Sequence, residues 1–161
     1  MNDNQKYEVR LRPFTPQDQS ATRNLILDGL GSHFGFIDET LNSDLDDIWQ
    51  HYVVPGNIFV VAEIEGQIVG SGALIKEAKG VGRLVRMSVS ANYQRRGIGR
   101  KLVQHLIQRA IEQGYQCLLV ETNHDWYDAI GLYQSCGFRE YDRDEESVHF
   151  QQIVPHNPLK G

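Results

Sequence analysis

A short segment rich in glycine and arginine, residues 94–100, is the part of this chain best suited to bind a charged ligand. It reads Gln-Arg-Arg-Gly-Ile-Gly-Arg. Because glycine has no Cβ, the backbone at Gly97 and Gly99 can approach a bound group closely. The segment opens an amphipathic helix, and the first turn of a helix carries unpaired N–H groups and the positive end of the helix dipole. With the added charge of the arginines, the segment predicts a pyrophosphate site.

The segment differs from the two common nucleotide-binding loops. It lacks the GxxxxGK[ST] pattern of a P-loop and the GxGxxG pattern of a dinucleotide fold, since Arg100 to Leu102 follow Gly99. The alternative is a solvated basic patch with no ligand. The two glycines, placed directly after a strand and before a helix, favour phosphate binding over that alternative.

The elements that position this segment follow from hydrophobic periodicity. An apolar run at residues 84–89 predicts a strand before it, and helical spacing predicts a helix over residues 97–113, closed by Gly114. A second apolar run at residues 117–120 predicts a buried strand. A strand, helix and strand in this order require a right-handed crossover and a parallel strand pair.

Other patterns complete the outline of the fold. Alternation over residues 7–12 predicts a strand, and Thr15 with Pro16 opens a helix that we expect to end at Gly29 and Gly31. A second helix is expected between residues 38 and 52, with Leu41, Leu45, Ile48, Trp49 and Tyr52 as its apolar positions.

The remaining strands and the last helix are expected to surround the crossover unit. Residues 58–64 and 68–75 read as a hairpin. Residues 125–135 read as a helix, and residues 138–141 and 148–154 as closing strands. The predicted order is β-α-α-β-β-β-α-β-α-β-β, a single α/β (α+β) domain over residues 1–161 with a mixed, mostly antiparallel sheet. Residues 155–161 are expected to form a loose tail.

Composition excludes several classes of function. A net charge of −5 and a pI near 5.6 argue against nucleic acid as the partner. We expect no membrane span, because no apolar run approaches ~18 residues, and no signal peptide, because the first ten residues are polar. The two cysteines and six histidines lack metal-ligand spacing, so no metal site is expected. These features predict a cytoplasmic protein with free thiols at Cys117 and Cys136.

Two motifs resemble the GNAT acetyltransferase superfamily. Residues 94–99 match its acetyl-CoA signature, and residues 129–138 (AIGLYQSCGF) are similar to its A-x-x-L-Y-x-x-x-G-F block. The predicted elements fit that family over nearly the whole chain. The resemblance implies an acetyl-CoA-dependent N-acetyltransferase, with acetyl-CoA as cosubstrate and a primary amine of a small molecule or peptide as acceptor. It also implies direct attack of the amine through a tetrahedral intermediate.

The resemblance assigns roles to particular positions. Backbone groups of Met87 and Val89 would pair with the pantetheine arm, Asn123 would hydrogen-bond it, and Tyr133 would act as general acid on the leaving thiolate. The Met87 N–H would stabilise the oxyanion. The residues implied in cofactor binding are Met87, Val89, Gln94, Arg95, Arg96, Gly97, Ile98, Gly99, Arg100, Asn123 and Tyr133.

The general base stays open at this stage. Many family members carry a glutamate on the central strand, but the matching position here is Val85. Glu121, Glu63 and His33 are the remaining candidates, and a water chain is a further alternative. A binding protein that keeps the fold without turnover is a second hypothesis, and an unrelated nucleotide-binding domain is a third.

The acceptor is also open. His33, Phe34 and Phe36 could floor its pocket. Acidic residues gather where GNAT enzymes bind the acceptor, and they could either attract a cationic amine such as a polyamine or form a solvated helix face. They are Asp38, Glu39, Asp44, Asp46 and Asp47. A homodimer through residues 148–154 is a further expectation.

Overall fold

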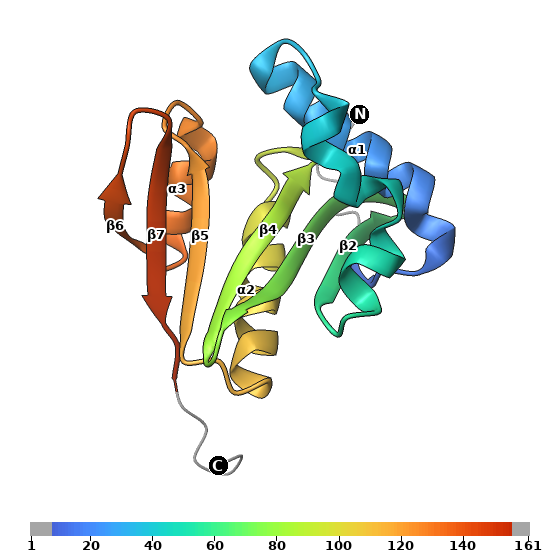
Figure 1. Cartoon of the computed structure of the whole chain (residues 1–161). Coiled ribbons are helices and arrows are strands. Elements are labelled where there is room, and N and C mark those ends of the chain that lie inside the picture. The colour runs from blue at the N-terminus through green and yellow to red at the C-terminus, as the bar shows by residue number, and fades with distance from the viewer. Residues whose placement is uncertain (1–7, 156–161) are drawn as a thin grey trace.

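The computed structural model describes residues 8–155 and contains one seven-stranded sheet with the order β1-β2-β3-β4-β5-β7-β6 (Figure 1). Its strands are β1 (Arg10–Pro13), β2 (Ile58–Ile64), β3 (Gln67–Ala78), β4 (Val81–Val89), β5 (Cys117–Asn123), β6 (Arg139–Arg143) and β7 (Ser147–Ile153). Only β4 and β5 pair in parallel, and the other neighbours are antiparallel. The predicted mixed, mostly antiparallel sheet is therefore confirmed. The expected tail falls almost entirely on residues 156–161, outside the described part of the chain.

Helices cover the two faces of the sheet unequally. The helices are α1 (Gln19–Phe34), α2 (Ile98–Glu112) and α3 (Tyr127–Ser135), with short helical turns η1 (Pro16–Asp18), η2 (Glu39–Asp46), η3 (Trp49–Val53) and η4 (Ala91–Tyr93). In Figure 1, α2 and α3 lie behind the sheet, whereas α1 with η2 and η3 covers β2 to β4 on the other side. That second face is left uncovered over β5, β7 and β6 (Figure 1).

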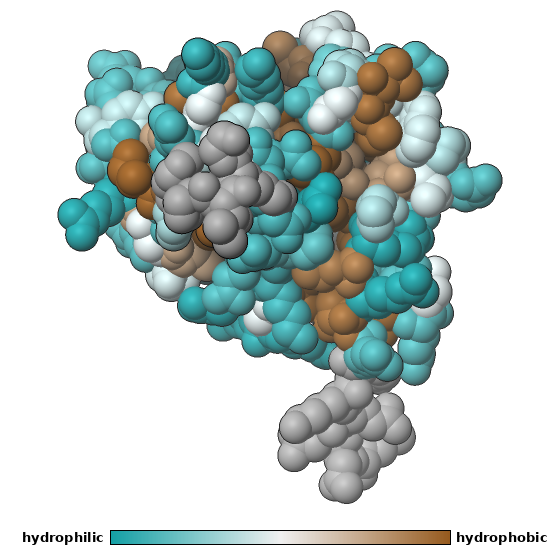
Figure 2. All heavy atoms as spheres, turned by 90° about the horizontal axis from the view of Figure 1, so that it is seen from below, coloured by the Kyte–Doolittle hydropathy of each residue, from teal (hydrophilic) through white to brown (hydrophobic). Residues whose placement is uncertain are grey.

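Two apolar clusters hold these layers together. On the α2 side, Leu102 and Leu106 pack with Val120 and Phe150, all at most 2% exposed. On the α1 side, Ile26, Leu45, Ile48 and Phe59 form the second cluster. Elsewhere, the surface seen from below is mainly hydrophilic, with smaller apolar patches between charged groups (Figure 2). The amphipathic patterns that predicted α2 and the strands therefore correspond to real buried faces.

The predicted start of the first helical segment is confirmed, since Thr15 is the N-cap of η1, which begins at Pro16 and leads directly into α1. The expected C-terminal end of α1 is wrong. The helix runs through Gly29 and Gly31 to Phe34 and ends at Gly35, whose φ of 79° suits glycine. The two internal glycines instead permit close packing: an added Cβ would lie 3.2 Å from the Ser88 Oγ at Gly29 and 3.2 Å from an Ile37 side-chain carbon at Gly31. Gly29 thus lets α1 approach β4 closely.

The prediction of a second helix between residues 38 and 52 is also wrong, because this segment contains no regular α-helix. Residues 39–46 form a 3₁₀ helix that is interrupted at Asn42, and residues 49–53 form a π-helical turn. The Asp38 side chain accepts the Thr40 N–H at 3.0 Å, and the Asn42 side chain donates to the Asp38 carbonyl at 2.7 Å. Such local side-chain hydrogen bonds compete with the α-helical pattern. The apolar positions Leu45 and Ile48 are nevertheless buried as expected, whereas Leu41 is 76% exposed.

The run expected to mediate a dimer lies inside the sheet. Strand β7 pairs with β5 on one side and with β6 on the other, so β6 is the edge strand. Ile153, at the end of β7, is 75% exposed.

Candidate functional site

The parallel pair β4–β5 separates after a short contact. Its register runs from Val81 opposite Cys117 to Leu84 opposite Val120 and then stops. Beyond that point β5 remains paired with β7, and β4 remains paired with β3. Two adjoining cavities of about 240 and 370 Å³ open between the separated strands. Both are bordered by residues 84–86 of β4 and 121–123 of β5.

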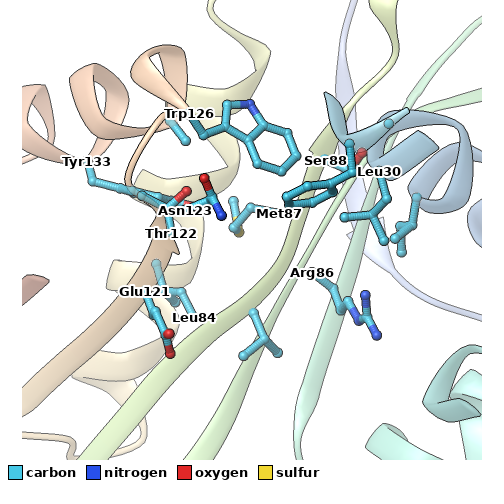
Figure 3. A pocket seen from close by; sticks show the side chains of 15 residues that line it. Leu30, Leu84, Arg86, Met87, Ser88, Glu121, Thr122, Asn123, Trp126 and Tyr133 are labelled. Atoms are coloured by element: carbon cyan, nitrogen blue, oxygen red, sulfur yellow. The ribbon is translucent and has the colours of Figure 1, made fainter. Parts of the chain in front are cut away.

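A β-bulge marks the start of this separation. Between the pairs Ser71–Ser88 and Ala73–Val85, two residues of β4, Arg86 and Met87, oppose Gly72 alone. Arg86 has a φ of 55°, and its carbonyl accepts the Ser71 hydroxyl at 2.8 Å. The bulge therefore places Met87 beside the opening, where Figure 3 shows it between the two walls. An exposed strand edge at this point can pair with an extended ligand.

Tyr133, Asn123 and Met87, to which the resemblance assigns roles toward the cofactor, line the smaller cavity together (Figure 3). Tyr133 projects from α3, is 5% exposed, and packs edge-on against Phe138 at 6.0 Å between ring centroids. Burial raises the pKa of the Tyr133 hydroxyl well above its ordinary value. The phenol is therefore protonated at neutral pH and can donate a hydrogen bond toward the cavity.

The predicted pyrophosphate segment forms the N-terminus of α2. Gly97 is the N-cap with a φ of 80°, and no side chain caps the helix there. Its carbonyl accepts the first intrahelical bond, from the Lys101 N–H at 3.1 Å. The N–H groups of residues 98–100 therefore have no partner inside the helix. Free amides at this position, beside an open strand edge, fit a ligand that combines a pyrophosphate with an extended arm.

The polar side chains of this segment differ in what they contact. The Arg96 guanidinium lies 5.2 Å from the centre of the Tyr93 ring, whereas Arg100 donates to the Ser135 Oγ at 2.9 Å. The Gln94 amide reaches the Val89 carbonyl at 3.3 Å. Within residues 8–155, neither Arg95 nor Arg96 makes an ion pair. These two arginines are therefore available to an anion, while Arg100 is already engaged.

The structure separates the three candidate bases. Glu63 is bound to Arg12 at 3.1 Å on the β1–β2 side of the sheet. His33 contacts Asp125 at 3.0 Å and stacks on Trp126, with 4.0 Å between ring centroids. Glu121 borders both cavities, and within the described chain it makes no hydrogen bond or ion pair. Of these three candidates, Glu121 is the carboxylate that faces the cavities.

An ionic network beside the bulge was missed at the sequence level. The Arg86 guanidinium binds the Asp44 carboxylate through two hydrogen bonds of 2.6 and 2.9 Å and donates to the Asn42 amide oxygen at 2.9 Å. The Tyr52 hydroxyl donates to the same carboxylate at 2.5 Å. Figure 3 shows Arg86 directed away from Tyr133 and Trp126. An arginine inside an otherwise apolar strand run was the available signal.

The sequence analysis also did not predict that three aromatic rings meet at the mouth of the cavity. The rings of His33 and Phe34, at the end of α1, contact the Trp126 ring, which follows β5. Phe34 and Trp126 both line the smaller cavity. Their separation by 92 residues gives no local pattern, so only the fold brings them together.

Within residues 8–155, no group of three or more His, Cys, Asp or Glu side chains is arranged to hold a metal ion, and no helix is long and apolar enough to cross a membrane. Burial raises the pKa of the Cys117 thiol, which lies at the start of β5 away from the cavities.

Known proteins resemble this chain in sequence and in fold. The chain is 38% identical over 111 residues to N-acetyltransferase family 8 member 2 of Rattus norvegicus, a match that covers 65% of this chain and 49% of that protein. The chain spans about half to three fifths of the length of such relatives.

Solved structures show the same fold. A GNAT-family acetyltransferase from Staphylococcus aureus Mu50 superposes with a TM-score of 0.85 at 23% identity, covering 92% of this chain and all of the other. The PaiA N-acetyltransferase of Thermoplasma acidophilum, solved with coenzyme A, gives 0.76 at 14% identity, covering 91% and 99%. The model of the acetyltransferase (GNAT) family matches residues 24–138. This chain therefore belongs to the GNAT acetyltransferase family.

Proposed function

We propose that this protein transfers the acetyl group of acetyl-CoA to a primary amine. The observation that supports it most strongly is the proximity of three features. The bulged edge of β4 and Tyr133 line the same cavity, and the free amides at the start of α2 lie next to the end of β4, since a Cβ added at Gly99 would be 3.8 Å from the Val89 side chain. The relatives are named N-acetyltransferases, and one neighbour of the same fold was solved with coenzyme A.

In this proposal the pyrophosphate lies against the amides of residues 98–100, with Arg95 and Arg96 adding charge. Met87 and Val89 bind the pantetheine arm along the β4 edge, and Asn123 binds it from the opposite wall. The bound thioester supplies an activated acetyl group. The Met87 N–H stabilises the negative charge that develops on the carbonyl oxygen.

Glu121 is the proposed general base. A primary amine is mostly protonated at neutral pH, so it must lose a proton before it can attack. Glu121 is the carboxylate among the residues that line the cavities. In this proposal it takes the role of the glutamate that many family members carry on the central strand, where this chain has Val85. The ammonium group gives one proton to Glu121, which passes it to solvent. After the N–C bond forms, the nitrogen loses a second proton, the C–S bond breaks, and the departing thiolate takes up one proton through water, so the products are the amide, the thiol and one released proton.

Tyr133 serves the leaving group. Its raised pKa lies above that of a thiol, so the hydroxyl keeps its proton and donates a hydrogen bond to the departing sulfur. This refines the general-acid role implied by the family: donation of a hydrogen bond is favoured over complete proton transfer.

The test is amine-dependent release of thiol from acetyl-CoA, measured with wild type, Tyr133→Phe and Glu121→Gln. We expect both variants to lower kcat by roughly 10²-fold or more, with the acetyl-CoA Kd from calorimetry changed less than about threefold. Glu140→Gln, on the edge strand β6, is the matched control and should behave as wild type. Acetyl-CoA binding without thiol release for any amine would instead support the binding-protein hypothesis.

A further inference from the structure

The acceptor side of the smaller cavity is apolar. Ile26, Leu30 and Phe34 recur every fourth residue along one face of α1, and all three line the cavity. Trp126 faces them from the opposite wall, and its ring meets that of Phe34 edge-on at 6.0 Å between centroids. In Figure 3, Trp126 lies above Met87 and Leu30 lies across from it, on the side of α1.

The charges at this cavity are few and unequal. Arg86 and Glu121 are the arginine and the carboxylate residue among its lining residues. Arg86 is neutralised by Asp44, with which it makes two hydrogen bonds. Glu121 makes no hydrogen bond or ion pair within residues 8–155; the Arg83 guanidinium of the adjoining cavity interacts with it electrostatically but is bound to Glu77. The Glu121 carboxylate can therefore attract one cationic nitrogen.

The acidic residues of the η2 segment do not form a rim for a polycation. None of them lines either cavity. Asp44 is paired with Arg86, and the carboxylates of Asp46 and Glu39 lie 3.9 Å from Arg23. Asp38 and Asp47 accept backbone N–H groups within their own turns. The hypothesis of a polyamine site therefore loses its structural basis.

The cavity mouth continues into exposed apolar side chains. Phe34 is 43% exposed, Phe36 70% and Ile37 43%, in a chain whose other large apolar residues are mostly buried. Large apolar groups beside a cavity are typical of a surface that an apolar ligand covers. Contact with such a ligand would remove this surface from water.

We infer that the acceptor is a primary amine carried on an apolar body, an arylalkyl or branched alkyl amine. The body lies between the α1 face (Ile26, Leu30 and Phe34) and Trp126, and the nitrogen points toward Glu121. This inference rests on the proposed function and names the substrate class of the same site. One carboxylate matches one ammonium group, and the wall formed by the α1 face and Trp126 offers hydrophobic contact.

The first experiment compares amines as acceptors. Acetyl-CoA turnover is measured with 2-phenylethylamine and isoamylamine, with methylamine as a truncated amine, and with putrescine and spermidine as polycations. We expect kcat/KM for 2-phenylethylamine to exceed the values for methylamine and putrescine by about tenfold or more. A preference for the polyamines would overturn the inference.

The second experiment tests the apolar wall. Trp126→Ala and Phe34→Ala should each raise KM for 2-phenylethylamine by about tenfold, leave methylamine kinetics nearly unchanged, and preserve the acetyl-CoA Kd. Trp126→Phe should restore most of the loss. Tyr127→Ala and Leu41→Ala, which remove exposed apolar side chains outside the cavity lining, are matched controls. An equal effect on both amines would show a structural role and overturn the inference.

A third measurement separates failure of this inference from failure of the proposed function. The CoA-bound protein is titrated with 2-phenylethylamine by calorimetry, which requires no turnover. Binding that Trp126→Ala weakens, without acetylation of any amine, would retain the acceptor class and reject the transferase. Acetylation confined to polar amines would retain the transferase and reject the acceptor class.

Discussion

Gly97 and Gly99 belong to one sequence motif but are needed for different physical reasons. Gly97 has a φ of 80°, and a Cβ added there would meet no atom within 4 Å. A Cβ at Gly99 would lie 3.1 Å from the Leu132 Cδ2 of α3. The first position requires backbone freedom, whereas the second requires space between helices.

We therefore expect Gly97→Ala to lower the free energy of unfolding by about 1–2 kcal/mol, because the left-handed conformation is unfavourable for a residue with a Cβ. Gly97→Asn should cost less, since asparagine tolerates that region better. Urea denaturation checks both variants. Equal stability of Gly97→Ala and wild type would show that this backbone conformation is not required in solution.

Gly131 provides the opposite case. It lies inside α3, is exposed, and has no atom within 4 Å of an added Cβ. Gly131→Ala should therefore raise the free energy of unfolding by about 0.5–1 kcal/mol through helix propensity. Urea denaturation checks this variant too. A lower free energy of unfolding for Gly131→Ala than for wild type would contradict the absence of neighbouring atoms at this position.

Motif positions at the residue scale were predictable from the sequence, but their environments were not. The segment around Gly97 and the positions of Tyr133 and Asn123 follow from two local patterns. The positive φ of Arg86 and its pairing with Asp44 depend on residues 42 positions apart. The sequence also offered no reason to prefer Glu121 over Glu63 or His33 as the general base. Only the fold shows that Glu63 and His33 have partners and that Glu121 makes no hydrogen bond or ion pair within the described residues.

At the scale of elements, the Arg86–Asp44 pair attaches η2 to the bulge of β4. Their side chains are only 17% and 13% exposed. Replacing Asp44 with alanine would leave the guanidinium charge without its partner, so we expect a loss of about 2–4 kcal/mol in the free energy of unfolding. Asp46→Asn is the control, because that carboxylate is 70% exposed and makes only a 3.9 Å contact. Denaturation curves that show similar stability for both variants would contradict this role.

Elements with a continuous apolar period were predicted well, and those controlled by local polar groups were not. Strand β2 and helix α2 follow their patterns closely. In residues 38–53, Asp and Asn side chains bond their own backbone and replace the expected α-helix with tighter and wider turns. The separation of β4 from β5 has no local signature, because it arises from a bulge on one strand and continued β5–β7 pairing on the other.

For the whole molecule, the pKa shifts predict how stability varies at low pH. Arg12 lowers the pKa of Asp18 through two hydrogen bonds, and Arg86 and Tyr52 lower that of Asp44. Because the unfolded chain binds protons first, stability from these groups is present above about pH 4 and is lost as pH falls further. Urea denaturation at several pH values should show a smaller acid loss for Asp18→Asn than for wild type. An unchanged slope would contradict the assignment.

At high pH, stability is expected to change because of tyrosines rather than carboxylates. Burial raises the pKa of Tyr52, Tyr115 and Tyr133 in the folded protein. Above about pH 10 the unfolded chain loses these protons first, so stability should fall as pH rises. Tyr133→Phe should reduce that slope, and an equal slope for the variant and wild type would show that Tyr133 is not shielded from solvent.

The most direct test of the central claim is the fate of the acetyl group itself. The protein is incubated with acetyl-CoA carrying a deuterated acetyl group and with 2-phenylethylamine, and mass spectrometry quantifies the labelled amide against the thiol released. We predict one labelled amide for each thiol, at a rate that Tyr133→Phe and Glu121→Gln both reduce. Thiol release without labelled amide, or labelled amide formed equally well by both variants, would contradict the proposed transfer at the opening between β4 and β5.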